Sequence, residues 1–169
     1  MNIQKSLCNI SFKKSLKGKC SVCSEKKEDI PCYIYKLEPS KDMDYFKKIK
    51  NKGDWDNSKH LDTISMVNNF LKKSSPFSIY TMESKAGDCL GFAEICDFDE
   101  EFEISTMETA PKLESHQSDK SKLNYITESF ISFFAKLANK KMKLALNIEA
   151  EPSSVSFLIK NCNFKNYML

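Results

Sequence analysis

The stretch FSIYTMESKAGDCLGFAEICDFDEEFEISTMET, residues 77–109, decides the fold of this chain. It holds three runs rich in β-branched and aromatic residues, a composition typical of β-strands. Polar segments around Gly87 and Asp99 separate the runs and predict turns. The runs, residues 77–83, 89–98 and 102–109, therefore predict an antiparallel meander of three strands.

The segments on either side alternate between strand and helix patterns. Apolar residues at helical spacing predict helices at residues 41–49, 60–73, 125–140 and 153–160. Further strands are expected at residues 30–37, 142–148 and 163–169. This order predicts an α+β fold, a three-layer α/β arrangement in which a mixed, mostly antiparallel sheet carries helices on both faces.

The chain has 169 residues, enough for one domain with a sizeable core. Residues 1–29 are rich in Lys and Ser with weak hydrophobic periodicity, so we expect an irregular N-terminal arm before a domain of residues 30–169. No apolar run approaches the roughly 18–20 residues that a membrane span needs. The first residues also lack the apolar segment of a signal peptide.

The cysteines indicate a reducing compartment. There are seven, an odd number with no secretory signal, so we expect free thiols and a cytoplasmic location. Cys20 and Cys23 form a CxxC pair, but a zinc site would need a second close Cys/His pair, and none is present in the sequence. We therefore expect no metal site.

Charge is distributed unevenly along the chain. The net charge is +3, which does not call for a nucleic-acid partner or a membrane. Residues 1–52 carry thirteen Lys against six acids, residues 53–111 four against twelve, and residues 112–169 nine against five. The acidic run at residues 97–103 would attract a cationic amine such as a polyamine, an aminoglycoside or a lysine-bearing peptide, or it is simply a solvated hairpin turn.

Five segments resemble, in order and spacing, the Gcn5-related N-acetyltransferase superfamily. Leu90–Ile95 (LGFAEI) is similar to its "GF" strand, 102–111 to its central strand ending in V-x-P, 130–138 to its "LLxxLxxxA" helix, 143–148 to its "ktLnV" strand, and 151–164 to its "NpaAixFYeklGF" ending. The resemblance covers residues 30–169. It implies the acyl-coenzyme A N-acyltransferase fold, acetyl-coenzyme A as co-substrate, and central strands that splay apart near residues 106–111.

The glycine loop that grips the cofactor's pyrophosphate in this family has no glycine here. One alignment places it at residues 122–127, and the other at 117–122. We prefer the first, because the second puts Thr127 and Glu128 where buried leucines belong. The cofactor contacts implied by the resemblance are then Met107, Thr109, Lys120, Lys122, Tyr125 and Thr127. Lysines supply charge without the fixed geometry of a backbone cradle, so we expect weak, salt-sensitive binding.

The catalytic groups also depart from the family pattern. Leu158 stands where many members place the tyrosine that protonates the leaving thiolate. The candidate general bases are Glu103 and Glu108, with Glu94 beside them. Strand alternation places Glu103 and Glu108 on opposite faces, so both can face one cleft only if a bulge intervenes. His116 and Trp55 are further candidates, the first for proton transfer and the second for closing on substrate.

The sequence thus predicts an N-acetyltransferase-like protein that moves an acetyl group from acetyl-coenzyme A to an amine. The acceptor is a small molecule or a protein, cationic if the acidic run takes part, and the chain is compatible with a homodimer. Two alternatives stay open. One is a catalytically inactive binding module of the same fold, and the other is a nucleic-acid accessory protein that uses its basic residues 1–27.

Overall fold

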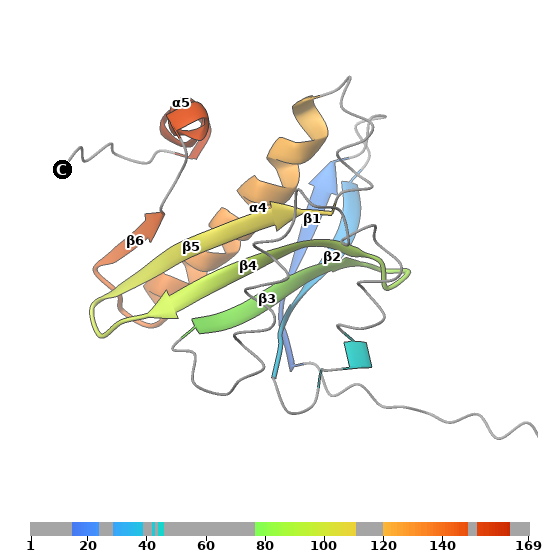
Figure 1. The fold of residues 1–169 in the computed structure, drawn as a ribbon, viewed down its shortest axis with the longest axis horizontal. Coiled ribbons are helices and arrows are strands. Elements are labelled where there is room, and N and C mark those ends of the chain that lie inside the picture. The colour runs from blue at the N-terminus through green and yellow to red at the C-terminus, as the bar shows by residue number, and fades with distance from the viewer. Residues whose placement is uncertain are drawn as a thin grey trace, which may run out of the picture.

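The computed structural model describes residues 15–23, 29–38, 42, 44–45, 77–110, 120–148 and 152–162, and these are the described residues below. Within them a single sheet has the strand order β1-β2-β3-β4-β5-β6 (Figure 1). The strands are Ser15–Cys23 (β1), Asp29–Lys36 (β2), Phe77–Ser84 (β3), Cys89–Asp97 (β4), Glu101–Thr109 (β5) and Ala145–Ile148 (β6). All neighbours are antiparallel except β5 and β6, so the predicted mixed, mostly antiparallel sheet and its central meander are confirmed.

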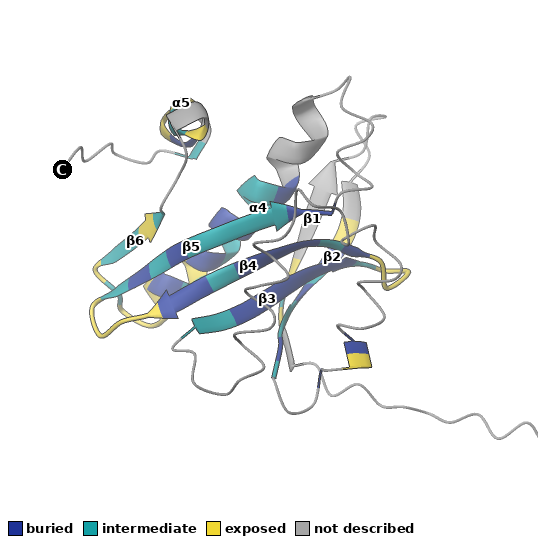
Figure 2. Ribbon diagram, viewed as in Figure 1, coloured by how far each residue is buried: buried dark blue, intermediate teal, exposed yellow. Residues whose placement is uncertain are grey.

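The helix α4, Lys120–Lys140, covers one face of the sheet. Alternate strand residues point at it, and the middle of β3 and most of β4 are buried on both faces (Figure 2). The resulting core joins strand residues such as Ile34, Met82 and Ile104 to Phe130 and Phe134 of the helix. Phe134 meets Tyr80 edge to face, with ring centroids 5.1 Å apart. Burial of these aromatic side chains therefore determines how the helix lies on the sheet.

The opposite face of the sheet meets a helical turn at residues 44–45. The buried Tyr45 hydroxyl donates to Glu83 Oε1 at 2.5 Å and lies 3.2 Å from Thr81 Oγ1. Burial raises the pKa of Tyr45 well above its ordinary value, and the nearby charges of Cys89 and Glu83 add to the effect. Tyr45 is therefore a neutral hydrogen-bond donor that anchors this turn to β3.

The strand β1 lies within the stretch expected to be an irregular arm. It pairs with β2 over its whole length, from Ser15↔Lys36 to Cys23↔Asp29, and it packs beside α4. Gly18 contacts the helix so closely that a Cβ there would lie 2.6 Å from the Phe133 ring. For residues 15–23 the expectation is therefore wrong, and the sheet begins upstream of residue 30.

The helical ends differ from the prediction in smaller ways. The helix α4 begins at Lys120 rather than at residue 125, and α5 spans Pro152–Cys162. The strand β6 begins three residues later than expected, because residues 141–144 form the connection from α4, with Met142 at a positive φ of 56°. The predicted helix at 60–73 and the closing strand at 163–169 lie outside the described residues, as does most of the helix expected at 41–49.

Candidate functional site

The strands β5 and β6 share only a short ladder. Their parallel pairing runs from Glu101↔Ala145 to Ile104↔Ile148, and β6 ends there within the described residues. The strand β5 continues to Thr109, still paired with β4 on its other side. From Ser105 to Thr109, β5 therefore presents an edge that no described strand covers (Figure 1). The pairing ends at Ile104, slightly before the divergence expected near residue 106.

A β-bulge in β5 settles the question left open by strand alternation. Glu94 pairs with Thr106 while its neighbour Ile95 pairs with Ile104, so Ser105 is the extra residue on β5. The extra residue reverses the alternation, and Glu103 and Glu108 consequently share one face of the sheet. Both carboxylates are half-buried, and both lie on the face opposite α4.

Glu94 belongs to the same face and is held by the bulge itself. Ser105 Oγ donates to Glu94 Oε2 at 3.2 Å and approaches the Glu94 carbonyl oxygen at 3.4 Å. Burial raises the pKa of Glu94, and the hydrogen bond from Ser105 opposes that rise. Burial also raises the pKa of the Cys96 thiol, and the charges of Glu103 and Glu94 raise it further. These three ionisable groups therefore lie close enough to influence one another.

The uncovered edge of β5 presents backbone groups of Met107 and Thr109. The Ala110 N–H donates to the Leu90 carbonyl at 2.9 Å, so Ala110 directs its polar groups at β4. The Glu108 carbonyl also faces β4, because a Cβ on Gly91 would lie 2.6 Å from its oxygen. Polar groups of successive strand residues alternate in direction. Those of Met107 and Thr109 consequently point to the uncovered edge.

The helix α4 passes this end of the β4–β5 pair with its N-terminal half. A Cβ on Gly91 would also lie 3.4 Å from Ile126 and from Phe130, so these residues of α4 pack where β4 and β5 pair last. The first turn contains no acidic residue. A helix N-terminus carries partial positive charge from its free N–H groups, so this end of the site is suited to an anion.

The preferred alignment of the cofactor loop is wrong. Residues 122–127 are helical, because α4 begins at Lys120 and contains neither Gly nor Pro to stop it. Thr127 is half-buried in the helix, while only the backbone of Lys120, Lys122 and Tyr125 is described. The other alignment, 117–122, places the loop at the helix start, but residues 117–119 lie outside the described residues.

The remaining residues singled out from the sequence lie either in the core or outside the described residues. Leu158, which stands at the position of the family's proton-donating tyrosine, is buried and packs in the core. His116 and Trp55 lie outside the described residues. Sequence reasoning missed Glu83, which is 5 % exposed and bound by Tyr45. No spacing signal could reveal it, since its partner lies 38 residues away in the chain.

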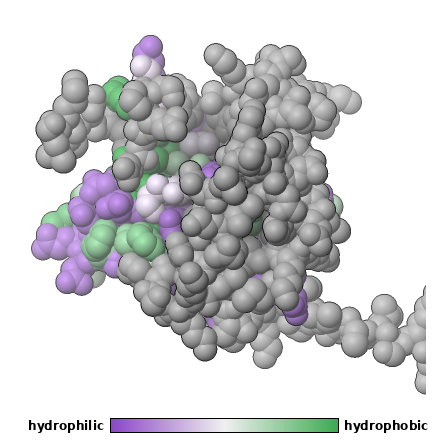
Figure 3. Space-filling view, viewed as in Figure 1, coloured by the Kyte–Doolittle hydropathy of each residue, from purple (hydrophilic) through white to green (hydrophobic). Residues whose placement is uncertain are grey.

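Most of the acidic run, residues 97–101, lies at the other end of the meander from this edge. The turn between β4 and β5 is separated from Thr109 by the length of β5, roughly 27 Å at about 3.4 Å per residue. Asp97 is bound there by Lys141 and Lys143. The surface at this end mixes hydrophilic with exposed apolar side chains (Figure 3), including Phe98. Of this run only Glu103 lies on the sheet face together with Glu94 and Glu108.

The described residues include no metal-binding cluster and no helix suited to a membrane. No group of three His, Cys, Asp or Glu side chains in the described part of the chain is arranged to hold a metal ion. Among the helices described, none has the length and apolarity needed to cross a membrane. Cys96 and Cys162 are free thiols.

The arrangement is shared with solved structures. A probable acetyltransferase is 12 % identical over 80 % of this chain and 95 % of its own, with a TM-score of 0.52. The chain has the fold of the Gcn5-related N-acetyltransferases. No protein-family model matches the sequence, and no curated protein is similar to it. The Gcn5-related fold is thus shown by structure at an identity too low to carry over a substrate.

Two further neighbours illustrate the range of proteins with this Gcn5-related fold. Ribosomal-protein-alanine N-acetyltransferase from Brucella melitensis biovar Abortus 2308 is 13 % identical over 82 % of this chain and 98 % of its own, with a TM-score of 0.49. Glucosamine-6-phosphate N-acetyltransferase from Arabidopsis thaliana is 13 % identical over 82 % and 94 %, with a TM-score of 0.48.

Proposed function

We propose that this protein is an N-acetyltransferase that moves an acetyl group from acetyl-coenzyme A to an amine of a cationic small molecule or protein. The observation that carries the proposal is the edge of β5 from Ser105 to Thr109, which no described strand covers, near the N-terminal half of α4. The free thiols of Cys96 and Cys162 support the expected cytoplasmic location.

The cofactor fits the groups that line this edge. The arm of coenzyme A is extended and contains amides, which can pair with an open strand edge as another strand would. Met107 and Thr109 offer N–H and C=O groups there, and the start of α4 with Lys120 and Lys122 would hold the phosphates. When bound, acetyl-coenzyme A supplies the acetyl group as an activated thioester. An N–H of Met107 or Thr109 would stabilise negative charge on the acyl oxygen.

The carboxylates on the sheet face would accept the amine's proton. Glu108 lies between Met107 and Thr109 in sequence and on the face opposite α4, so we assign it as the first candidate base. Glu103 shares that face and is the second. Glu94 lies on the same face and in its ionised form adds negative charge that favours a cationic acceptor. Leu158 has no proton to give, so the leaving thiolate takes its proton from solvent.

The test combines calorimetric binding with product mass spectrometry on a panel of diamines, polyamines, aminoglycosides and lysine peptides. We expect Glu108→Gln to lower kcat/KM about 100-fold or more, as loss of a general base does, with little change in acetyl-coenzyme A affinity. Glu100→Gln is the matched control, because Glu100 is exposed at the β4–β5 turn. Full activity of Glu108→Gln and Glu103→Gln would refute the assignment of both bases.

The dependence of acetyl-coenzyme A affinity on salt tests the contribution of Lys120 and Lys122. For wild type we expect acetyl-coenzyme A affinity to fall as salt rises, because point-charge attraction is screened beyond about 8–10 Å. Lys120→Ala/Lys122→Ala should be weaker at low salt and less salt-dependent. Tight, salt-insensitive binding in this double variant would show that the helix backbone holds the phosphates alone.

A second function, an inactive binding module, is favoured by Leu158 in the core and by the absence of glycine from α4. Binding of coenzyme A without turnover of any amine would support it. Absence of binding at every salt concentration would support a module that does not use the cofactor at all.

A further inference from the structure

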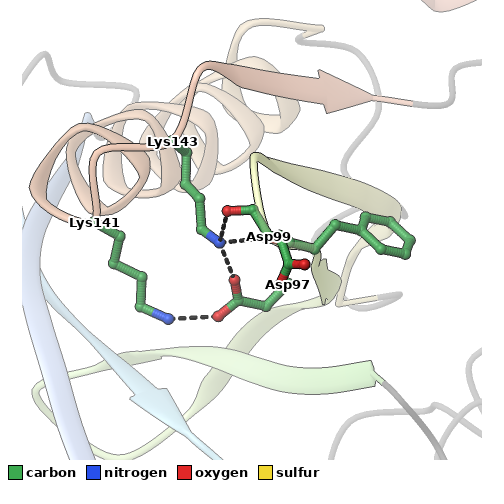
Figure 4. Close-up of polar contacts among 5 residues, drawn as sticks. Asp97, Asp99, Lys141 and Lys143 are labelled. Carbon is green, nitrogen blue, oxygen red and sulfur yellow. Dashed lines mark hydrogen bonds and ion pairs between the residues drawn. The ribbon is translucent and has the colours of Figure 1, made fainter.

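Two lysines grip the turn between β4 and β5 (Figure 4). Lys143 Nζ lies 2.8 Å from Asp97 Oδ1 and donates to the Asp99 carbonyl at 3.0 Å. It also donates to the Phe98 carbonyl. Lys141 Nζ binds the other Asp97 oxygen, Oδ2, at 2.5 Å. Asp97, Lys141 and Lys143 are called the turn clamp below.

The two lysines of the turn clamp are not equivalent. The Lys143 side chain is only 9 % exposed, whereas that of Lys141 is 47 % exposed. Lys143 has three oxygen acceptors for its three N–H groups, and its ammonium lies 5.3 Å from the centre of the Phe102 ring. Burying a charge costs free energy unless the charge is fully paired, so the Lys143 ammonium is stable only where these acceptors surround it. Lys141 is free to exchange its partner for water.

The turn clamp lies where β6 begins. Immediately after Lys143, the Leu144 N–H donates to the Glu100 carbonyl at 2.6 Å, and Ala145↔Glu101 is the first pair of the parallel ladder. That ladder has four pairs and is the only parallel pairing in the described sheet. A four-pair ladder supplies few hydrogen bonds of its own. The contacts at the start of the ladder therefore contribute much of what fixes the position of β6.

We propose that Lys143 is a positioning residue for the donor site: by pinning the start of β6 to the β4–β5 turn, it sets the line along which β6 leaves β5. The edge of β5 from Ser105 onward is then held uncovered at the far end of the ladder. The inference rests on the proposed function for its consequence in catalysis, but the placement of β6 can be measured without any ligand.

Lys143→Met tests this role, because methionine keeps the apolar stem over Phe102 and removes the charge. We expect amide hydrogen exchange of Ala145–Ile148 in the ligand-free protein to accelerate about tenfold or more, the equivalent of roughly 1.4 kcal/mol. The acetyl-coenzyme A Kd and KM should rise by a similar factor while kcat changes less than about twofold. Lys141→Met is the matched control and should change each quantity less than about twofold.

Further variants separate a role of the Lys143 charge from a general loss of folding. Lys143→Arg keeps the charge and donors and should restore much of the protection. If Lys143→Met does not fold, Asp97→Asn keeps hydrogen-bonding oxygen on the turn and should show the same pattern more weakly. Unchanged exchange in β6 for the folded variants would overturn the proposal. Faster exchange in β6 together with no acetyl-coenzyme A binding by wild type would support the turn clamp and reject the proposed function instead.

Discussion

Replacing Gly91 with alanine should separate β4 from β5 at the candidate site. The added Cβ would lie 2.6 Å from the Glu108 carbonyl oxygen, and that oxygen belongs to a backbone held in the sheet. Reaching ordinary contact at 3.4 Å needs a shift of about 0.8 Å, since 3.4 − 2.6 = 0.8. Such a shift stretches the adjacent Ala110 N–H to Leu90 hydrogen bond, now 2.9 Å.

The expected cost follows from these two effects. Overpacking a tight position costs about 1–3 kcal/mol, and weakening one ladder hydrogen bond adds about 0.5–1.5 kcal/mol. We therefore expect Gly91→Ala to lower the free energy of unfolding by about 2–4 kcal/mol, measured by urea denaturation with an unchanged m-value. Amide exchange at residues 107–110 should rise in parallel, because the strain is applied there.

Gly87→Ala is the matched control for this substitution. Gly87 has a φ of +81° in the β3–β4 turn, but a Cβ there would meet nothing within 4 Å. Its cost should come from the backbone conformation alone, about 1–2 kcal/mol, and exchange at 107–110 should not change. A Gly91→Ala protein within about 0.5 kcal/mol of wild type would refute the close approach of β4 and β5.

Three further predictions concern other contacts. Burial raises the pKa of Asp97, but the hydrogen bonds and charges of Lys141 and Lys143 outweigh it, so the folded pKa is lowered. The contribution of Asp97 to stability is therefore present above its unfolded pKa and is lost as the pH falls through the lower folded value. The difference in unfolding free energy between wild type and Asp97→Asn should disappear in acid, and a difference independent of pH would contradict this. Ser105→Ala removes the hydrogen bond that holds down the pKa of Glu94, so an NMR titration should show a further rise, and an unchanged value would disprove the contact. Gly18→Ala should destabilise by about 1–3 kcal/mol through contact with Phe133, and Phe133→Leu should recover part of the loss if β1 packs on α4 as described.

The sequence by itself determined the strands of the central meander and the long helix. Each is a run of residues whose own side-chain pattern repeats with the period of a strand or a helix, so local chemistry was sufficient. The core positions of α4 followed from the same pattern, since Ile126, Phe130 and Phe134 recur at helical spacing and are all buried. The resemblance in five segments was enough to indicate the fold, because order and spacing survive where single residues change.

The strand β1 could not be read from the sequence. Its residues SLKGKCSVC lack a continuous apolar face, and its stability comes from pairing with β2 and from α4 covering Gly18. The start of α4 was misplaced for a related reason. Four of residues 120–124 are polar, and the helical state of this segment depends on the packed turns that follow, from which helix formation extends cooperatively.

Tertiary structure alone decided how the candidate site is built. Alternation placed Glu103 and Glu108 on opposite faces, and the bulge at Ser105 brought them together, because register between two strands is a property of the pair. Asp97 and Lys143 are 46 positions apart, so their contact depends on the chain closing on itself. Local periodicity specifies the elements, whereas the carboxylate face, the uncovered edge of β5 and the turn clamp exist only once those elements pair.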